Sequence, residues 1–533
     1  MESKKYQAFW RGAIILTIAS FVTKVLSAFY RIPYQNIAGD IGFYIYQQIY
    51  PFYGFCLILA TYGFPIIISK MVAERLERGK KQEAEEIICV SFWFLLGIGF
   101  IGFFTLFFGA EAIATAMGDI HLDKLLRVIS FSFILMPFLS VARGYFQGFN
   151  NMMPTAVSQV IEQTIRVSII VFLSLFLIAH EFDLYTVGAG AMLGSIAGGL
   201  IGIIVLILYM RHDFRSIFFK SVKRIKGKKK IIKILFWQGL AICVSNLVLI
   251  FIQMADSVSF YSLLIGAGEP AESAKVLKGV YDRSIPLMQL GTVVTTSFSL
   301  SLIPIITAAK ERGDLTFIRE KVRLAMKITF VIGFAAAIGL TCIIQPTNIM
   351  LFENSDGSDV LSILSLSILF SSLSITTASI LQGLGQTLKP AIFVVFGGCL
   401  KLVLNYILMP YFGAKGAAIA TLVALIVISV LNSMLLMRAV SESLIDKRNM
   451  LGIVISGFSM GFVLIMFMRV LQMSGLVMDT SHRGVATFEA LLGVAIGGLA
   501  YMFLILKLRV FTKAEIRTVM KKEKKEGSLK KSG

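Results

Sequence analysis

The stretch WRGAIILTIASFVTKVLSAFYRI, residues 10–32, is an apolar run long enough to cross a bilayer, and it carries a lysine, Lys24, far from both of its ends. A charge at mid-membrane costs about 3 kcal/mol, so this side chain is expected to face a bundle interior or a watery cavity. Other apolar segments contain Arg31, Arg166, Arg283 and Lys401. Several buried cations together predict a binding site for an anion.

Similar apolar runs recur along the whole chain. Its 533 residues are 56% hydrophobic and 15% charged, with a mean hydropathy of +0.81. This composition is typical of an all-α polytopic membrane protein. Runs of about 20 residues predict about 14 spans, at residues 10–32, 43–69, 86–109, 124–146, 154–179, 186–210, 232–254, 280–309, 324–351, 360–382, 388–410, 416–438, 450–473 and 485–507.

Positive charge is distributed unevenly between the connections that join these spans. The net charge is +20, and basic clusters at residues 70–81, 211–233, 310–327 and 507–531 lie at alternate connections, whereas the other connections are acidic. This positive-inside pattern predicts a multi-pass protein of the cell membrane with both termini in the cytoplasm. We expect the basic clusters to contact anionic membrane lipids and not nucleic acid.

The residue types that usually bind metals are scattered. The five cysteines lie within predicted spans without metal-binding spacing, and the four histidines lie in loops or at span ends. The sequence therefore predicts no disulfide, no metal site, no catalytic site and no cofactor.

The chain repeats itself at an offset of about 235 residues, which is six spans. Gly148 and Gly383 close the fourth and tenth spans, and Arg166 and Lys401 lie in the fifth and eleventh. Because six is even, both halves share one orientation and are expected to be related by a pseudo-twofold axis along the membrane normal.

The repeat also predicts the domain boundaries. We expect a first six-helix lobe at 1–210, a basic cytoplasmic linker at 211–231 and a second six-helix lobe at 232–440. Two additional C-terminal spans occupy 441–510, and a basic cytoplasmic tail occupies 511–533.

Polar residues follow one face of the first predicted span. They are Thr17, Ser20, Lys24, Ser27 and Arg31, spaced three or four residues apart. At 1.5 Å per residue, Lys24 lies about 20 Å into the membrane and Arg31 lies near its outer surface. This face is expected to line a cleft between the lobes.

The eighth span begins with Asp282 and Arg283 and carries Gln289 one to two turns deeper. Since Arg283 lies at a depth similar to that of Arg31, the two are expected to converge. Guanidinium groups match phosphate oxygens in geometry, and an ammonium adds a point charge. Lys24, Arg31 and Arg283 therefore predict a phosphate or pyrophosphate site.

Carboxylates in the spans offer a competing explanation for some of these cations. Asp282 or Asp256 is a candidate to neutralise Arg283. Glu162 precedes Arg166 by four residues, a spacing that favours an ion pair within one helix.

Three motifs carry a family resemblance. Residues 405–421, NYILMPYFGAKGAAIAT, resemble the eleventh-to-twelfth helix signature of the multidrug/oligosaccharidyl-lipid/polysaccharide exporter superfamily, in its MurJ/SpoVB-like branch of Gram-positive polysaccharide biosynthesis flippases. TKVL at 23–26 followed by Arg31 is similar to that branch's first-helix pattern. Tyr281-Asp282-Arg283 is similar to its eighth-helix motif.

This resemblance implies a flippase for a polyprenyl-pyrophosphate-linked saccharide that works by alternating access. The family's cavity residues correspond to Lys24, Arg31 and Arg283, and its acidic residue in the first outer loop corresponds to Asp40. The last two spans are expected to form a groove for the lipid tail. A second-helix arginine of the family has no counterpart near Gln47, Gln48 or Tyr53.

Some relatives bind sodium between helices seven, eleven and twelve. The matching residues here are Asp256, Lys401, Asn405 and Thr421. Lys401 would place an ammonium where sodium binds, paired with Asp256. We therefore expect no sodium requirement at this point.

Several functions are compatible with the sequence. A flippase for a lipid-linked anionic saccharide is favoured, because cations predominate in the spans. We expect it to be a monomer. A drug or cation antiporter of the same superfamily is the nearest alternative. A membrane glycosyltransferase or ligase would need acid and base groups on a long loop, and a scaffold for envelope assembly remains open.

Overall fold

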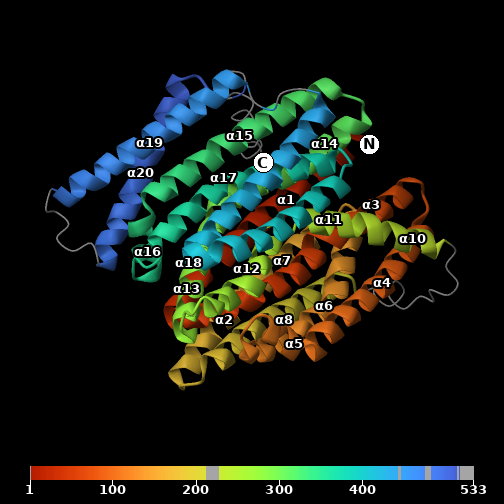
Figure 1. Cartoon of the computed structure of the whole chain (residues 1–533). Coiled ribbons are helices and arrows are strands. Elements are labelled where there is room, and N and C mark those ends of the chain that lie inside the picture. The colour runs from red at the N-terminus through yellow and green to blue at the C-terminus, as the bar shows by residue number, and fades with distance from the viewer. Residues whose placement is uncertain are drawn as a thin grey trace, which may run out of the picture.

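Long apolar helices run side by side through the molecule (Figure 1). This computed structural model describes residues 2–211, 227–441, 444, 446–473, 482–512 and 515, and every regular element among them is a helix. The chain is therefore an all-α polytopic membrane protein, as the composition predicts.

Two lobes and a C-terminal pair make up the bundle. The first lobe contains α1 (Glu2–Phe29), α2 (Arg31–Ile58), η1 (Leu59–Gly63), α3 (Phe64–Glu77), α4 (Lys81–Phe108), α5 (Ala110–Ala116), η2 (Ile120–Leu122), α6 (Asp123–Gly148), α7 (Met153–Ala179) and α8 (Leu184–Tyr209). The second contains α10 (Lys228–Ile234), η4 (Leu235–Gly239), α11 (Leu240–Ser245), α12 (Val248–Gly266), α13 (Ala271–Asp282), α14 (Ser284–Glu311), α15 (Leu315–Cys342), α16 (Ile344–Phe352), α17 (Ser358–Gly383) and α18 (Leu388–Val440). The last pair is α19 (Lys447–Met473) and α20 (Arg483–Lys507), which packs on α15 and α16.

The number of spans is consistent with the predicted 14. Among the described residues, 11 helical segments are long and apolar enough to cross a membrane. Two of them, Ile15–Glu77 with 63 residues and Leu388–Val440 with 53, are long enough for two crossings each. Helix α14 is a further 28-residue helix between the lobes.

Glycines in the left-handed region reverse the chain inside these two long segments. Gly39 has φ 68° and Gly413 has φ 53°, which a residue with a Cβ adopts only with strain. The first span therefore continues in helical geometry past Arg31 and turns at Gly39.

Several predicted spans are interrupted, which is a correction to the sequence analysis. The predicted span 232–254 breaks at Asn246 and Leu247 and continues to Gly266. The predicted span 280–309 breaks at Arg283, between α13 and α14, and the predicted span 324–351 divides into α15 and α16. A break of one or two residues leaves hydropathy unchanged, so an apolar run cannot reveal it.

The internal repeat is visible in helix packing. A Cβ on Gly148 would lie 2.6 Å from Val72 on α3, and a Cβ on Gly383 would lie 2.9 Å from Ile306 on α14. Both glycines thus let the fourth and tenth spans approach the second and eighth closely, as small residues do between membrane helices.

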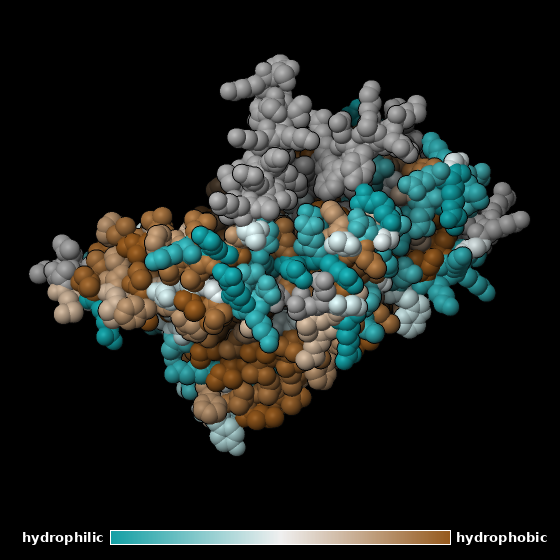
Figure 2. All heavy atoms as spheres, turned by 90° about the horizontal axis from the view of Figure 1, so that it is seen from above, coloured by the Kyte–Doolittle hydropathy of each residue, from teal (hydrophilic) through white to brown (hydrophobic). Residues whose placement is uncertain are grey.

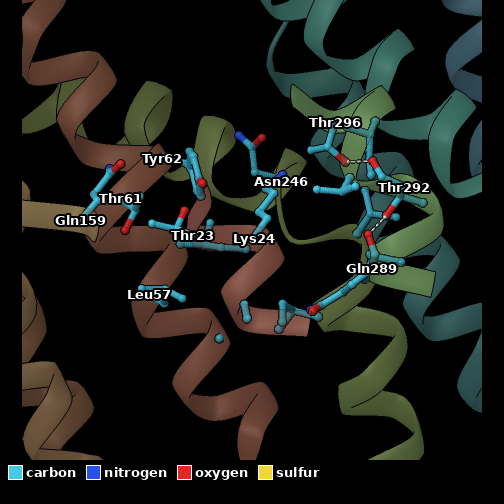
Figure 3. A pocket seen from close by; sticks show the side chains of 18 of the residues that line it. Thr23, Lys24, Leu57, Thr61, Tyr62, Gln159, Asn246, Gln289, Thr292 and Thr296 are labelled. Carbon is cyan, nitrogen blue, oxygen red and sulfur yellow. Dashed lines mark hydrogen bonds between the residues drawn. The ribbon is translucent and has the colours of Figure 1, made fainter. Parts of the chain in front are cut away.

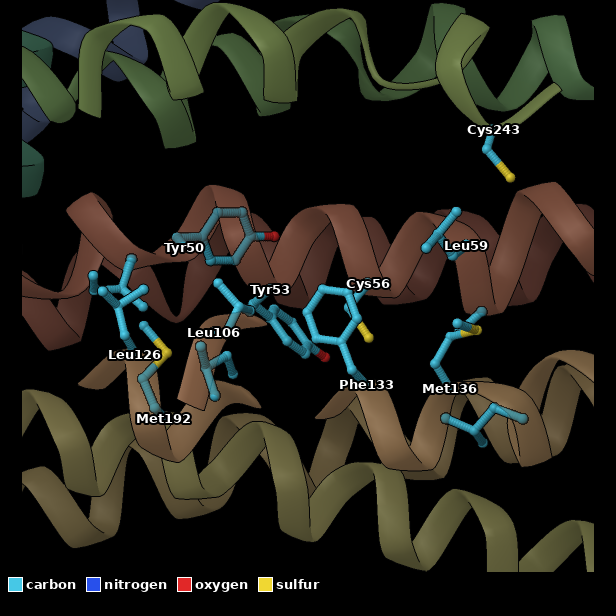
Figure 4. Packing of buried hydrophobic residues seen from close by; sticks show 14 of the residues in the cluster. Tyr50, Tyr53, Cys56, Leu59, Leu106, Leu126, Phe133, Met136, Met192 and Cys243 are labelled. Atoms are coloured by element: carbon cyan, nitrogen blue, oxygen red, sulfur yellow. The ribbon is translucent and has the colours of Figure 1, made fainter. Parts of the chain in front are cut away.

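Apolar side chains fill the first lobe and cover much of the exterior. Tyr53, Leu126, Phe133 and Met192 interdigitate between α2, α6 and α8 (Figure 4). Figure 2 shows large hydrophobic areas on the surface, with hydrophilic side chains gathered across the middle and right of that view. Such an exterior suits a lipid environment.

Most of the predicted linker at 211–231 and the tail at 511–533 lie outside the described residues. The structure therefore does not test their predicted roles.

Candidate functional site

A cavity of about 220 Å³ lies between the two lobes. Its walls come from α1, α2, η1, α6 and α7 of the first lobe and from α11, α12, α14 and α17 of the second. Helix α1 packs against both α7 and α14, so it forms the seam between the lobes. The cavity therefore occupies the cleft that the sequence predicts.

The cavity wall is rich in hydroxyl and amide groups. In Figure 3, Lys24 extends toward Asn246, with Tyr62 on one side and Thr292 and Thr296 on the other. The remaining polar, uncharged lining residues are Thr23, Ser27, Tyr50, Thr61, Gln159, Gln163, Ser245, Gln253, Gln289 and Ser379. Such groups can bind sugar hydroxyls.

Lys24 lies in the cavity as predicted. Its Nζ is 5.9 Å from the centre of the Tyr62 ring, and no carboxylate of the described residues forms an ion pair with it. An ammonium without a carboxylate partner leaves positive charge in the cavity.

Arg166 also lines the cavity, but the predicted ion pair with Glu162 is wrong. Glu162 instead pairs with Arg143 on α6, which the sequence analysis missed. Arg166 is 1% exposed and its Nη1 donates to the Tyr53 hydroxyl at 2.6 Å. Its Nε and Nη2 have no hydrogen-bond partner among the described residues. No local pattern in the sequence indicates Arg143 as the partner of Glu162, because the pair joins two helices.

Arg31 joins the lobes at the edge of the cavity. Its Nη1 donates to the Ser27 carbonyl at 2.7 Å and to the amide oxygen of Gln289 on α14. The guanidinium carbon is 4.3 Å from the centre of the Tyr50 ring. Its Nε and Nη2 have no hydrogen-bond partner in the part of the chain that the structure describes, and the residue is fully buried.

Arg283 does not converge with Lys24 on the cavity, which corrects the predicted trio. Its Nε and Nη2 bind the Asp40 carboxylate at 2.7 to 3.0 Å, a two-pronged pair between the lobes. Its Nη1 donates to Asn348 at 3.2 Å and to Asn354 at 2.6 Å. This guanidinium is fully engaged, and the residue that neutralises it is Asp40, not Asp282 or Asp256.

A second contact between the lobes lies at the same end of the bundle, which we call the Asp40 end. Asp119 accepts hydrogen bonds from Tyr44 at 3.1 Å and Tyr185 at 2.6 Å and forms an ion pair with Lys275 at 3.5 Å. Because Lys275 lies on α13 and the other three residues lie in the first lobe, α13 is fastened to the first lobe here and at Asp40.

The predicted pair of Lys401 with Asp256 is confirmed. The Lys401 Nζ lies 2.7 Å from Asp256 and also donates to the Ala417 carbonyl at 2.9 Å, to Tyr281 at 3.2 Å and to Thr421. The ammonium therefore fills a cage of oxygen atoms. Oxygen is also the ligand type that hard metal cations prefer.

Asn405 and Asp282 complete this buried polar region. Asn405 donates to Asp256 at 3.1 Å and to Ser259 at 2.9 Å. Asp282 pairs with Lys278 one turn earlier on α13. Asp256 and Asp282 border a cavity of about 30 Å³ that shares Gln253 and Gln289 with the larger one.

The cations in and around the cleft fall into two classes. Arg143, Arg283, Lys278 and Lys401 each have a carboxylate partner. Lys24, Arg31 and Arg166 have none among the described residues and lie against tyrosine rings. The cleft therefore has a net positive charge and can attract an anion. No cluster of His, Cys, Asp and Glu in the described chain could hold a metal ion.

Comparison with known proteins finds two matching family models and several similar proteins. Residues 9–310 match the family model described as "Polysaccharide biosynthesis protein", and residues 279–407 match the model described as "MatE". The chain is 41% identical to "Uncharacterized membrane protein YabM" of Bacillus subtilis (strain 168), over 96% of this chain and 94% of that protein. It is 26% identical to "Lipid II flippase MurJ" of the same organism, over 92% and 94%.

A solved structure supports the fold. "Lipid II flippase MurJ, inward closed conformation" has a TM-score of 0.66 at 16% identity, and the match covers 93% of this chain and 99% of that chain. At this identity the similarity concerns the fold alone.

Proposed function

Because the chain belongs to the polysaccharide biosynthesis protein family of the multidrug/oligosaccharidyl-lipid/polysaccharide exporter superfamily, we propose that it moves a polyprenyl-diphosphate-linked saccharide across the cell membrane by alternating access. A relative named as a lipid II flippase supports this substrate class. Transport of this kind needs no covalent chemistry, only a cavity that shields the polar head from hydrocarbon.

The unbalanced positive charge of the cleft carries the proposal. Lys24 and Arg166 line the cavity without a carboxylate partner among the described residues, and Arg31 lies at its edge. A diphosphate supplies the missing negative charge and several strong acceptors. The hydroxyl and amide groups of the wall suit the attached sugar.

A cation or drug antiporter is the alternative within the superfamily, and the match to the MatE model is its support. A cationic substrate calls for a free carboxylate in the cavity. Among the described residues, Glu162 is the one carboxylate that lines the larger cavity, and Arg143 already neutralises it. The charge balance therefore favours an anionic substrate.

For the orientation and organisation we propose the arrangement that the sequence predicts. We place the Asp40 end outside the cell and both termini in the cytoplasm, with lobe boundaries at 1–210 and 232–440. The basic cytoplasmic connections contact anionic lipids, residues 441–510 offer a groove for the lipid tail, and the protein works as a monomer. In this arrangement Asp40 and Arg283 close the outer side of the cleft.

Reconstituted vesicles test the proposal. We expect the full chain to accelerate movement of a fluorescent polyprenyl-diphosphate disaccharide between leaflets, and Lys24→Ala and Arg166→Ala to abolish it. Arg127→Ala is the matched control, because Arg127 is 41% exposed and pairs with Asp123 away from the cavity. Movement of ethidium but not of the lipid by the unaltered protein would contradict the proposal.

A further inference from the structure

Three cations of the cleft have no carboxylate partner among the described residues: Lys24, Arg31 and Arg166. Each of them lies against a tyrosine from the segment 50–62. The guanidinium of Arg31 lies on the Tyr50 ring, 4.3 Å from its centre, and that of Arg166 lies 5.0 Å from the centre of the Tyr53 ring. These tyrosines belong to α2, and Tyr62, which lies beside Lys24, belongs to η1 directly after it.

A neutral tyrosine is an incomplete partner for a buried guanidinium. An arginine has five N–H donors, yet within the described residues only the Nη1 group of Arg166 has an acceptor, the Tyr53 hydroxyl at 2.6 Å. Both residues are buried, Arg166 at 1% exposure and Tyr53 at 3%. The phenol satisfies one donor and leaves the charge uncompensated, although the ring face offers some stabilisation.

A phosphate oxygen is the stronger acceptor for the same donor. A phosphate oxygen carries negative charge and so adds a Coulomb attraction that the neutral phenol cannot supply. An oxyanion that reaches Arg166 would therefore compete with the Tyr53 hydroxyl for Nη1. Lys24 lines the same cavity from α1, which packs against the α7 helix that carries Arg166. The two cations therefore line one cavity from neighbouring helices.

We propose that Arg166 and Lys24 form a diphosphate-binding subsite, and that the Tyr53 hydroxyl occupies the Arg166 donor until the diphosphate replaces it. This inference rests on the proposed function and adds to it that both cations bind the diphosphate itself and that Tyr53 is a competing internal ligand. Arg143 takes no part, because Glu162 already accepts from it.

Thermal unfolding of the full chain in detergent, titrated with inorganic pyrophosphate, tests the inference. We expect pyrophosphate to raise the melting temperature of the unaltered protein and Arg166→Gln to abolish this effect. In Tyr53→Phe the ring remains but the competing hydroxyl is gone, so the half-saturating concentration should fall by about fivefold, the equivalent of one hydrogen bond.

Two further variants make the result decisive. Tyr34→Phe is the matched control, because Tyr34 is also fully buried and its hydroxyl donates to the Gly42 carbonyl at 3.4 Å, not to an arginine. It should leave the pyrophosphate response unchanged. Lys24→Gln is the second test of the subsite if Arg166→Gln does not fold, because Lys24 is half-buried and makes no ion pair with any described residue. It should weaken the response.

The outcomes separate this inference from the proposed function. An unchanged or weakened response in Tyr53→Phe would overturn the competing role of Tyr53. A response of the unaltered protein that Arg166→Gln and Lys24→Gln both retain, or no response at all, would overturn the subsite. If vesicles still moved the lipid-linked saccharide in that case, the proposed function would stand and its anion site would lie elsewhere.

Discussion

Glu162 illustrates how helix packing selects the partner of a buried charge. Its spacing from Arg166 suits an ion pair within α7, yet it pairs with Arg143 on α6. Glycines of α8 bring that helix onto α7, and a Cβ on Gly202 would lie 3.2 Å from the Glu162 carboxylate. The carboxylate is thereby held between helices, where a partner from another helix satisfies it.

Removing the Glu162 carboxylate should lower the stability of the fold. Glu162→Leu leaves Arg143, which is fully buried, without its counter-charge, so we expect a loss of about 3 kcal/mol in the free energy of unfolding. Denaturation in detergent measures it. The double variant Arg143→Met with Glu162→Leu should recover much of the loss, and an equal loss in both would show that the pair is not the cause.

The ammonium of Lys401 predicts the response to sodium. We expect sodium to leave the melting temperature of the unaltered protein unchanged relative to choline at equal ionic strength. Lys401→Ala empties the oxygen cage around Asp256 and Thr421, so sodium should stabilise that variant. Stabilisation of the unaltered protein by sodium, lost in Asp256→Ala, would contradict the prediction.

At the scale of helices, hydropathy predicts what is long and apolar and fails where a helix is interrupted. The runs around α4, α7, α8 and α20 closely match the structure. The breaks at Asn246 and Arg283 do not alter the apolar pattern, whereas Gly63 and Pro65 mark the π-helical turn Leu59–Gly63 inside the second span. Such interruptions depend on contacts with other helices.

The approach of α13 to α2 provides a prediction for one element. A Cβ on Gly279 would lie 2.1 Å from the Asp40 carbonyl oxygen, and backbone cannot yield as a flexible side chain does. Gly279→Ala should therefore push α13 away and reduce the stability of the fold by about 2 kcal/mol. Gly266→Ala is the control, because nothing lies within 4 Å of its Cβ position. Similar melting temperatures for the two variants would contradict close packing here.

At the scale of the whole molecule, the two lobes and their cleft can be predicted from the repeat. Which cations have a carboxylate partner cannot be predicted from it. The pair of Lys401 and Asp256 could be predicted from matching positions in related sequences. The pair of Arg283 and Asp40 joins residues 243 positions apart in different lobes, and no local pattern encodes it. Sequence thus identifies buried charge more readily than it identifies which charges remain without a counter-charge.

The contacts between the lobes at the Asp40 end predict that a covalent cross-link there would stop transport. If transport requires this end to open, Asp119→Cys with Lys275→Cys, joined by a short reducible bis-thiol reagent in a background without other cysteines, should stop movement of the lipid-linked saccharide in vesicles. Reduction should restore it, and each single cysteine variant should be insensitive to the reagent. Undiminished movement in the cross-linked protein would show that the two lobes need not separate there.

The ammonium in the oxygen cage also constrains the energetics of the proposed cycle. While Lys401 keeps its proton, its charge stays on the chain and cannot be released into either compartment during a turnover, unlike a bound metal ion. After each complete cycle it has returned to its starting position and has performed no net electrical work. At this place in the protein the membrane voltage then has no metal ion to drive, so any voltage dependence of turnover would have to come from the cargo, from a proton exchanged at this pair, or from a charge exchanged elsewhere.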